Sequence, residues 1–208
     1  MSFSSFFSEQ ARKPTGFFGR RVMSVVFNKG NSFLNGFVEE LMSVQADDHI
    51  LEIGFGTGKL IHDLAKDIHK GYIEGIEFSS SMVSLAKKRN KKYIADEKVN
   101  IIKGNFDDLP IKNNRYTKVC TVNTIYFLSN LKNTANKILN ILAPEGKFFL
   151  AFEDKRQLEE RNLDLNVFRL YSTDDIKNLL VDAGFSSDVV IETRVKGKLS
   201  FHCVIAKK

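Results

Sequence analysis

The stretch that decides the fold is Ile50-Leu51-Glu52-Ile53-Gly54-Phe55-Gly56-Thr57-Gly58-Lys59. A short apolar run with one acid leads into alternating glycines. Apolar residues then recur at helical spacing: Leu60, Ile61, Leu64, Ala65 and Ile68. The glycines therefore mark a tight turn from a buried strand to a helix, where the backbone can approach a ligand closely. Because a helix start adds unpaired N–H groups and a partial positive charge, the turn predicts a site for a nucleoside or an anionic group.

Two ligand classes compete for this turn. The dinucleotide fingerprint is G-x-G-x-x-G, and here the third glycine, Gly58, comes one residue early. Glu52 stands two residues before the first glycine. The pattern E-x-G-x-G-x-G instead resembles the first motif of the class I S-adenosylmethionine methyltransferases, in which the loop bends around the methionine and ribose parts of the cofactor. Taken alone, the motif also fits a glycine-rich turn without a ligand.

A second strand, expected over residues 72–77, ends in Glu77, 23 residues after Gly54. At about this separation a carboxylate can accept hydrogen bonds from both ribose hydroxyls. The alternative is an exposed acid at the end of a strand, and the neighbouring glycine loop favours the ribose interpretation. Ser79, Ser80 and Ser81 are suitable helix N-caps directly after it.

Two further segments match the same family. Residues 99–110 are similar to its G-D-A-x-x-L-P segment, with Asn105 where the family has aspartate. The resemblance implies that the Asn105 amide oxygen accepts from the adenine amine and that Phe106 offers its backbone N–H to the ring. A polar surface loop is the other interpretation of Asn105. Residues 119–127 resemble the family's fourth strand and the start of its substrate loop.

Together these motifs imply a cofactor site for S-adenosylmethionine, with S-adenosylhomocysteine as product. The residues that the resemblance assigns to it are Glu52, Gly54, Phe55, Gly56, Gly58, Glu77, Phe78, Asn105, Phe106, Asn123 and Thr124. Tyr126, just past the fourth strand, is the candidate catalytic residue that touches the acceptor, and a partly buried loop aromatic is its equally good alternative. No metal site is expected among the 4 histidines and 2 cysteines.

The expected fold is α/β: a doubly wound, Rossmann-like, seven-stranded sheet, mostly parallel, with an antiparallel C-terminal hairpin. Strand and helix patterns alternate along the chain, as such a sheet requires. The turn at residues 143–146 resembles the family's L-x-P-G-G turn, with Glu145 in place of a glycine. Residues 172–175 have the spacing of a capping box, and Gly184 stands at the end of the helix that follows. Strands are expected over residues 188–195 and 199–206.

We divide the chain into an N-terminal helical arm, residues 1–46, on the substrate side and a methyltransferase domain, residues 47–208. Apolar residues at 33–42 predict a helix that packs on the sheet edge, capped by Asn31 or Ser32. Upstream, Phe17 and Phe18 lie between Gly16 and Gly19 and are candidate substrate residues. This arm fits a lid over the site, a patch for an anionic lipid headgroup, or a solvated segment.

Composition sets wide limits. With 208 residues, a net charge of +6 and 43% hydrophobic residues, the chain suits one domain with a real core. Cys120 and Cys203 fall in expected buried strands, which fits two core thiols and a cytoplasmic location. No stretch is apolar enough to span a membrane, so membrane contact would be peripheral. The basic cluster at residues 87–92 suits the end of a helix.

The sequence therefore predicts a methyltransferase related to quinone C-methylating and phospholipid N-methylating enzymes. Its acceptor would be a small molecule, a quinone-like ring or a lipid headgroup, methylated by in-line transfer. Residues 123–126 also resemble the [DN]-P-P-[YF] motif of amino-methylating nucleic-acid enzymes, but both prolines are missing, so nucleic acid is the minor alternative. The other alternative is a protein that binds the cofactor but does not catalyse methyl transfer. The acceptor atom, the need for a general base and the oligomeric state stay open.

Overall fold

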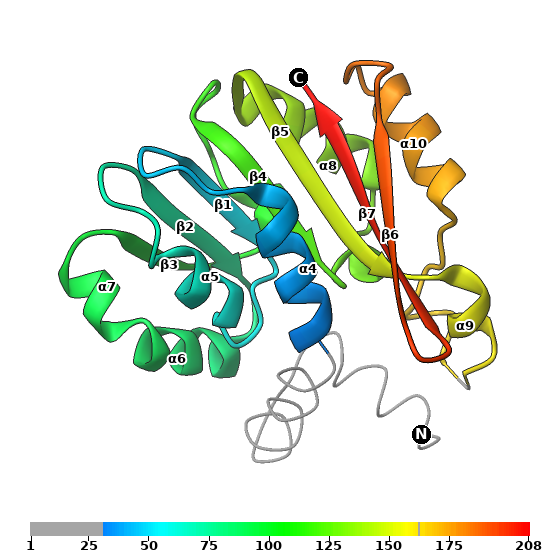
Figure 1. Ribbon diagram of the computed structural model, residues 1–208, viewed down its shortest axis with the longest axis horizontal. Helices are drawn as coiled ribbons and strands as arrows, with labels where there is room; N and C mark the ends of the chain where they lie inside the picture. Colours follow the sequence, from blue (N-terminus) through cyan, green and yellow to red (C-terminus); the bar gives the residue numbers. More distant parts are fainter. Residues whose placement is uncertain (1–30, 162) are drawn as a thin grey trace.

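The computed structural model describes residues 31–161 and 163–208. Seven strands form one sheet in the order β3-β2-β1-β4-β5-β7-β6 (Figure 1). The strands are β1 (His49–Ile53), β2 (Tyr72–Glu77), β3 (Val99–Lys103), β4 (Tyr116–Val122), β5 (Leu142–Glu153), β6 (Val190–Lys196) and β7 (Leu199–Lys207). The first five pair in parallel, and β7 runs antiparallel to both β5 and β6. The predicted fold class is confirmed.

The strand order reverses between β1 and β4, which lie side by side although β2 and β3 separate them in sequence. In open α/β sheets, ligands bind outside the carboxyl ends of the strands at such a switch point. The ends of β1, β2, β3 and β4 are where the sequence motifs placed Glu52, Glu77, Asn105 and Asn123. The topology therefore gathers the four motifs at one edge of the sheet.

Helices cover both faces of the sheet (Figure 1). One face buries the apolar sides of α4 (Ser32–Met42), α5 (Lys59–Leu64) and α6 (Ser80–Arg89), with α7 (Lys91–Ala95) packed beside them. The other face buries α8 (Leu131–Ile141) and α10 (Thr173–Asp182). The short α9 (Lys155–Glu159) and two 3-10 turns, η2 (Phe106–Asp108) and η3 (Ile125–Phe127), lie at the carboxyl end of the sheet. Two apolar layers thus enclose the parallel strands.

The helix α4 departs from its expected place at the sheet edge. Its buried side chains Leu34, Phe37, Val38 and Met42 pack over β4 and β5, in the interior of the sheet. The reason is that the apolar stripe of α4 is buried in one cluster with side chains of α5 and of the strands beneath it. Asn31 precedes the helix without capping it by its side chain, and instead its Oδ1 accepts a hydrogen bond from Asn123 Nδ2 at 2.9 Å. The start of α4 is therefore tied to the end of β4.

The turn expected at residues 143–146 lies within β5, which already pairs at Leu142 with Tyr116. The register then shifts between Tyr116 and Lys118, so these residues form an irregularity inside the strand. Glu145 has φ +65°, the left-handed conformation that favours glycine, so it keeps the backbone shape of the residue it replaces. The capping box of Ser172 and Asp175 is present as predicted.

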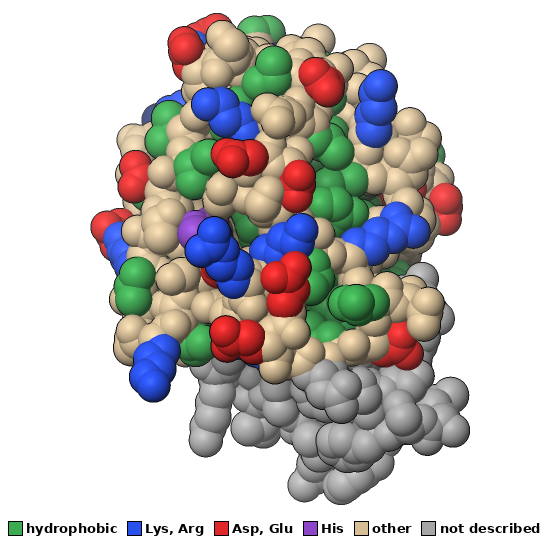
Figure 2. Space-filling view, turned by 90° about the vertical axis from the view of Figure 1, so that its right-hand side faces the viewer, with side chains coloured by type: hydrophobic (Ala, Val, Ile, Leu, Met, Phe, Trp, Pro, Cys, Tyr) green, Lys and Arg blue, Asp and Glu red, His purple; other side chains and the backbone are tan. Residues whose placement is uncertain are grey.

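The side of the molecule formed by α10 and β6 carries basic and acidic side chains together with hydrophobic ones (Figure 2). Its exposed apolar residues include Val181 of α10 and Val190 and Val195 of β6. Cys120 and Cys203 are both buried, and no disulfide joins them. None of the described helices has the length and apolar character that crossing a bilayer requires.

Candidate active site

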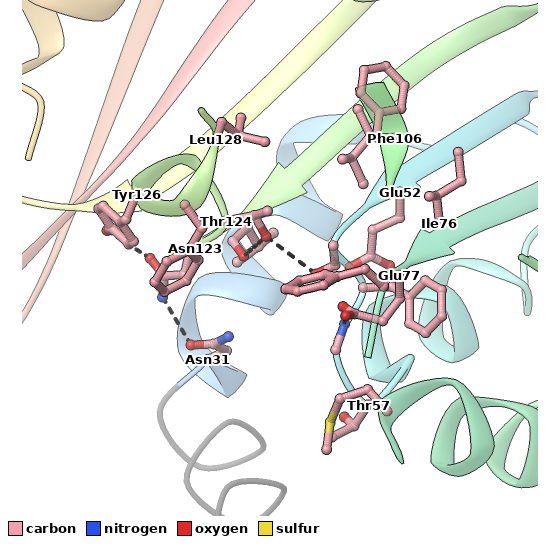
Figure 3. Close-up of a pocket in the computed structure, with 18 of the residues that line it drawn as sticks. Asn31, Glu52, Thr57, Ile76, Glu77, Phe106, Asn123, Thr124, Tyr126 and Leu128 are labelled. Carbon is pink, nitrogen blue, oxygen red and sulfur yellow. Dashed lines mark hydrogen bonds between the residues drawn. The ribbon is translucent and has the colours of Figure 1, made fainter. Parts of the chain in front are cut away.

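A cavity of about 640 Å³ opens at the carboxyl ends of the strands. Its walls come from β1, β2, β4 and β5, from the glycine loop, from η2 and η3, and from the segment around α9. Glu52 and Glu77 lie close together on one side, and Asn123 and Tyr126 lie across from them (Figure 3). The volume is in the range of pockets that bind cofactors and small molecules.

The glycine loop is shaped for close approach. Gly54 has φ +72°, and a Cβ at this position would lie 2.4 Å from Thr124 Oγ1, so a side chain would collide with the end of β4. Gly56 has φ +53°, and a Cβ there would meet no atom within 4 Å. The backbone at Gly56 therefore faces open space in the cavity, with no side chain to block a ligand.

Gly58 differs in its surroundings from the other predicted cofactor residues. It is absent from the cavity wall, whereas the other ten predicted cofactor residues line it. A Cβ at Gly58 would lie 2.7 Å from Ala86 Cβ and 3.0 Å from Asn90 Nδ2. The third glycine therefore allows the loop to pack against α6, and it supports the site from behind.

Glu77 reaches the glycine loop from the end of β2. Its Oε2 accepts from the Gly56 N–H at 3.2 Å, and its Oε1 accepts from the Ser79 N–H at 2.8 Å. The residue is buried, and desolvation raises the pKa of its carboxyl to about 7, although these backbone bonds act in the opposite direction. A carboxylate oxygen can accept more than one hydrogen bond, so both oxygens retain capacity for ligand hydroxyls.

Glu52 is the second buried carboxyl of this wall. Its Oε2 has no hydrogen-bond partner among the described residues. Burial, with the charge of Glu77 as a smaller cause, raises the pKa of Glu52 to about 8. Buried polar atoms nearly always have partners, so an unpartnered oxygen beside a cavity indicates a ligand or an ordered water there.

On the far side of Glu77, η2 brings Asn105 and Phe106 to the cavity. Asn105 Nδ2 donates to Asp108 Oδ2 at 2.9 Å, which directs its oxygen away from Asp108. The Phe106 N–H makes no bond to another described residue. An amide oxygen and a backbone donor therefore stand next to each other, as the edge of an adenine ring requires.

Tyr126 is buried, and its hydroxyl is held by two bonds. It donates to Asn123 Oδ1 at 3.1 Å and accepts from the Glu153 N–H at 2.8 Å. Burial raises the pKa of this phenol well above its usual value. Tyr126 is therefore neutral at working pH, and these two bonds fix the position of its hydroxyl. Asn123, with φ +52°, is fixed between Tyr126 and Asn31.

The remaining wall is apolar and aromatic, and the sequence analysis missed most of it. Its members include Phe127, Leu128, Leu158, Leu163, Phe168, Leu199 and Phe201. The rings of Phe127 and Phe168 lie 4.8 Å apart, with Tyr126 5.7 Å from Phe168. These residues come from η3 and the residue after it, from α9 and the segment after it, and from β7, which local motifs do not bring together. Phe17 and Phe18, the predicted substrate residues, lie outside the described residues.

One ion pair interrupts this apolar wall. Glu153, the last residue of β5, accepts from Arg161 at 2.5 Å and from Gln157 Nε2 at 3.1 Å, both through Oε2. Within the described residues, no donor reaches its Oε1. Like Glu77, Glu153 is an acid directly after a buried strand, and this position is the sequence signal that could have found it.

The residues present fit S-adenosylmethionine. The open backbone at Gly56 gives room for the ligand, Glu77 suits ribose hydroxyls, and Asn105 with the Phe106 N–H suits adenine. A cationic ligand beside Glu52 and Glu77 would lower the raised pKa of both carboxyls and so favour their negatively charged forms. The donor and acceptor set therefore agrees with the cofactor that the motifs imply.

Comparison with known proteins leads to the same class. A family profile described as "Methyltransferase domain" matches residues 50–146. An uncharacterized methyltransferase, YdaC of Bacillus subtilis, is 27% identical over 178 residues, which are 86% of this chain and 93% of that one. A putative methyltransferase of the same species, YrhH, is 24% identical over 58% of this chain and 66% of its own length. Demethylmenaquinone methyltransferase of Symbiobacterium thermophilum is 28% identical over 49% of this chain and 41% of its length.

Solved structures share the fold. A putative methyltransferase in complex with the Trm112 methyltransferase activator, from Haloferax volcanii, superposes with a TM-score of 0.79 at 16% identity and covers 99% of both chains. A phosphoethanolamine N-methyltransferase of Haemonchus contortus, in complex with S-adenosylhomocysteine, has a TM-score of 0.73 at 14% identity, over 85% of this chain and 52% of that one.

Fold, motifs and comparisons agree: residues 50–146, just under half of the chain, match a methyltransferase domain, and a relative and a solved structure that cover most of the chain are both named as methyltransferases. The Haemonchus enzyme was solved with S-adenosylhomocysteine, and the residues of this cavity fit the parent cofactor, S-adenosylmethionine. Among the proteins compared, YdaC is similar along most of both chains, whereas the quinone-methylating relative matches through about half of this one.

Proposed function

We propose that this methyltransferase acts on a small acceptor with an apolar or aromatic body, such as a quinone-like ring or a lipid with a polar headgroup. The observation that carries the proposal is the apolar wall of the cavity across from Glu52 and Glu77 (Figure 3). This wall includes Tyr126, Phe127, Leu128, Phe168 and Phe201. Burial of such a ligand against aromatic side chains supplies most of its binding free energy.

The cofactor residues keep the roles that the motifs imply. Glu77 would accept from the ribose hydroxyls, the loop at residues 54–58 would lie against the methionine part, and Asn105 with Phe106 would bind adenine. When bound, the cofactor supplies an activated methyl group. The chain's own contribution is alignment of the acceptor and exclusion of water, and alignment alone can lower a barrier by about 7–11 kcal/mol.

On the acceptor side, Tyr126 would act through its ring, because its hydroxyl is bound to Asn123 and Glu153. Glu153 offers Oε1 to an acceptor O–H or N–H, and Arg161 holds the other oxygen. This arrangement supports an acceptor that has one polar, proton-bearing group next to its apolar body. Glu153 would then take up the proton that the acceptor loses.

The division into a substrate-side arm, residues 1–46, and a cofactor domain, residues 47–208, is part of the proposal. Its support is α4, whose first turn and preceding residue bring Asn31 and Asn35 to the cavity wall. The link from Asn31 to Asn123 joins the two parts beside the predicted acceptor position.

A methyl-transfer assay tests the function. The purified protein is incubated with methyl-tritiated S-adenosylmethionine and, separately, with lipid, small-molecule, RNA and protein fractions of a cell extract. We expect label in the lipid or small-molecule fraction, with Asp67→Ala, an exposed acid on the chain segment after α5, as an unaffected control. Label in RNA would favour the amino-methylating alternative. Binding of S-adenosylhomocysteine without label in any fraction would favour a non-catalytic binding protein.

The similarity in fold to the Haloferax protein suggests a protein partner that the assay should include. That protein was solved with a methyltransferase activator. We therefore include a parallel assay with a small activator protein of that type, because activity that depends on it would otherwise be missed.

A further inference from the structure

The turn η2, which carries the predicted adenine-binding residues, is held in place by one lysine of α8. Lys137 Nζ donates to three backbone carbonyls of this turn: to Phe106 O at 2.5 Å, to Asp107 O at 3.0 Å and to Leu109 O at 2.7 Å. The ammonium also lies 4.7 Å from the centre of the Phe106 ring. An ammonium has three donors, so all three are used on a single turn.

A second side chain of α8 acts on the same turn. Thr134 Oγ1 lies 2.8 Å from Asp107 Oδ1 and 3.0 Å from Asn130 O, so its one proton is shared between these two acceptors, and Thr134 is fully buried. Thr134 and Lys137 are three residues apart, so they project from the same face of the helix. Two consecutive points of attachment therefore fix η2 against α8.

The attachment matters because η2 has few other constraints apart from the Phe106 side chain, which is buried in the core. Its own backbone bonds are weak, at 3.2 Å from Asp108 N to Asn105 O and 3.4 Å from Leu109 N to Phe106 O. Asn105 is exposed, and Asp108 is the one side chain among the described residues that bonds to its amide. A turn of this kind needs outside support to hold the Asn105 oxygen and the Phe106 N–H in one arrangement.

We propose that Lys137 is a positioning residue for adenine recognition: by fixing the carbonyls of η2, it holds Asn105 and Phe106 in the arrangement that reads the adenine edge. The proposal rests on the cofactor placement given above. Lys137 does not touch the cofactor, because the residues that line the cavity do not include it. Its effect would be on selectivity for adenine as well as on affinity.

Lys137→Met tests the proposal, because methionine keeps the chain length and removes the three donors. Binding of S-adenosylhomocysteine and of its deaminated analogue, S-inosylhomocysteine, is measured by calorimetry for each protein. The analogue lacks the amine that the Asn105 oxygen would accept from, so the wild type should prefer S-adenosylhomocysteine by about tenfold. In Lys137→Met this preference should fall to about twofold or less, through loss of affinity for S-adenosylhomocysteine.

Three comparisons make the outcome specific. Lys137→Arg keeps the charge and donors and should restore the preference to within about threefold of the wild type. Lys132→Met, at an exposed position of the same helix, should change nothing. Thr134→Val, which removes the second attachment, should also reduce the preference, and it serves where Lys137→Met does not fold.

Two results would contradict the account at different levels. An undiminished preference for S-adenosylhomocysteine in folded Lys137→Met, or in Thr134→Val where Lys137→Met does not fold, would overturn the proposal. No binding of S-adenosylhomocysteine to the wild type would overturn the cofactor placement itself, and with it this inference.

Discussion

At the scale of single residues, the site depends on two acids that the fold buries next to each other. Glu77 and Glu52 end up at the carboxyl ends of adjacent parallel strands, where solvent is largely excluded. Both were predicted as cofactor residues from the glycine motif and its spacing. Their burial raises the pKa of each carboxyl, because the charged form loses hydration.

Glu77→Ala should weaken binding of S-adenosylhomocysteine without unfolding the protein. A pair of charge-assisted hydrogen bonds to ribose should contribute about 1.5–3 kcal/mol, equivalent to a loss of affinity of about 10- to 150-fold. Calorimetry measures the affinity, circular dichroism checks the fold, and Asp67→Ala is the matched control. A folded variant that binds as tightly as wild type would show that Glu77 has no contact with the ligand.

Glu52→Gln should change how stability depends on pH. The folded pKa of about 8 lies above the unfolded value of 4.5, so between these values the folded chain holds a proton that the unfolded chain has released. Stability therefore falls as the pH rises through this window. Glutamine does not titrate, so between pH 5 and 8.5 the free energy of unfolding should fall less in the variant than in the wild type. The difference between the two decreases should be about 1–3 kcal/mol.

Urea denaturation at several pH values measures this difference. Glu97→Gln, at a surface turn, is the control, and its pH dependence should follow that of the wild type. If the free energy of unfolding changes equally with pH in Glu52→Gln and in the wild type, Glu52 is charged in the folded protein.

At the scale of elements, the sequence was sufficient where the signal is local. The order and kind of the strands and helices follow from apolar runs, helical stripes and turn residues between them, and the capping box of α10 was visible as Ser172 and Asp175. The start of β5 was not visible, since it depends on pairing between Leu142 and Tyr116, which are far apart in sequence. The position of α4 over β4 and β5 likewise depends on long-range packing.

The acceptor side of the cavity shows the same limit. Phe127, Phe168 and Phe201 come from three distant segments. Phe127 ends the segment that resembles the start of the family's substrate loop, whereas nothing local marks Phe168 or Phe201 as wall residues. Glu153 carries only the weak signal of an acid after a strand. The cofactor side was predictable because its residues belong to short motifs, whereas the acceptor side is assembled by the fold.

Ser172→Ala should destabilise the protein and leave cofactor binding unchanged. The Ser172 side chain accepts from the Asp175 N–H at 3.1 Å, and loss of such a cap costs about 1 kcal/mol. Since no residue of α10 lines the cavity, the affinity for S-adenosylhomocysteine should stay within twofold of the wild type. Urea denaturation and calorimetry measure the two quantities, and Asp174→Ala, beside the cap, is the control. A loss of affinity would show that α10 supports the site.

At the scale of the whole molecule, the parallel sheet places every cofactor motif at one edge, and α4, α9 and β7 complete the cavity around that edge. The net charge of +6 does not by itself select a partner, and the side of α10 and β6 carries both signs of charge (Figure 2). The shape and chemistry of the cavity, more than the overall charge, therefore favour a small apolar acceptor over nucleic acid.

The most direct test of the central claim is a pair of calorimetric titrations of the wild-type protein, one with S-adenosylhomocysteine and one with NAD. Glu52 before the loop and the early third glycine, Gly58, distinguish this site from a dinucleotide site. We predict saturable binding of S-adenosylhomocysteine with one site per chain and no tight binding of NAD. Tight binding of NAD without a response to S-adenosylhomocysteine would contradict the account.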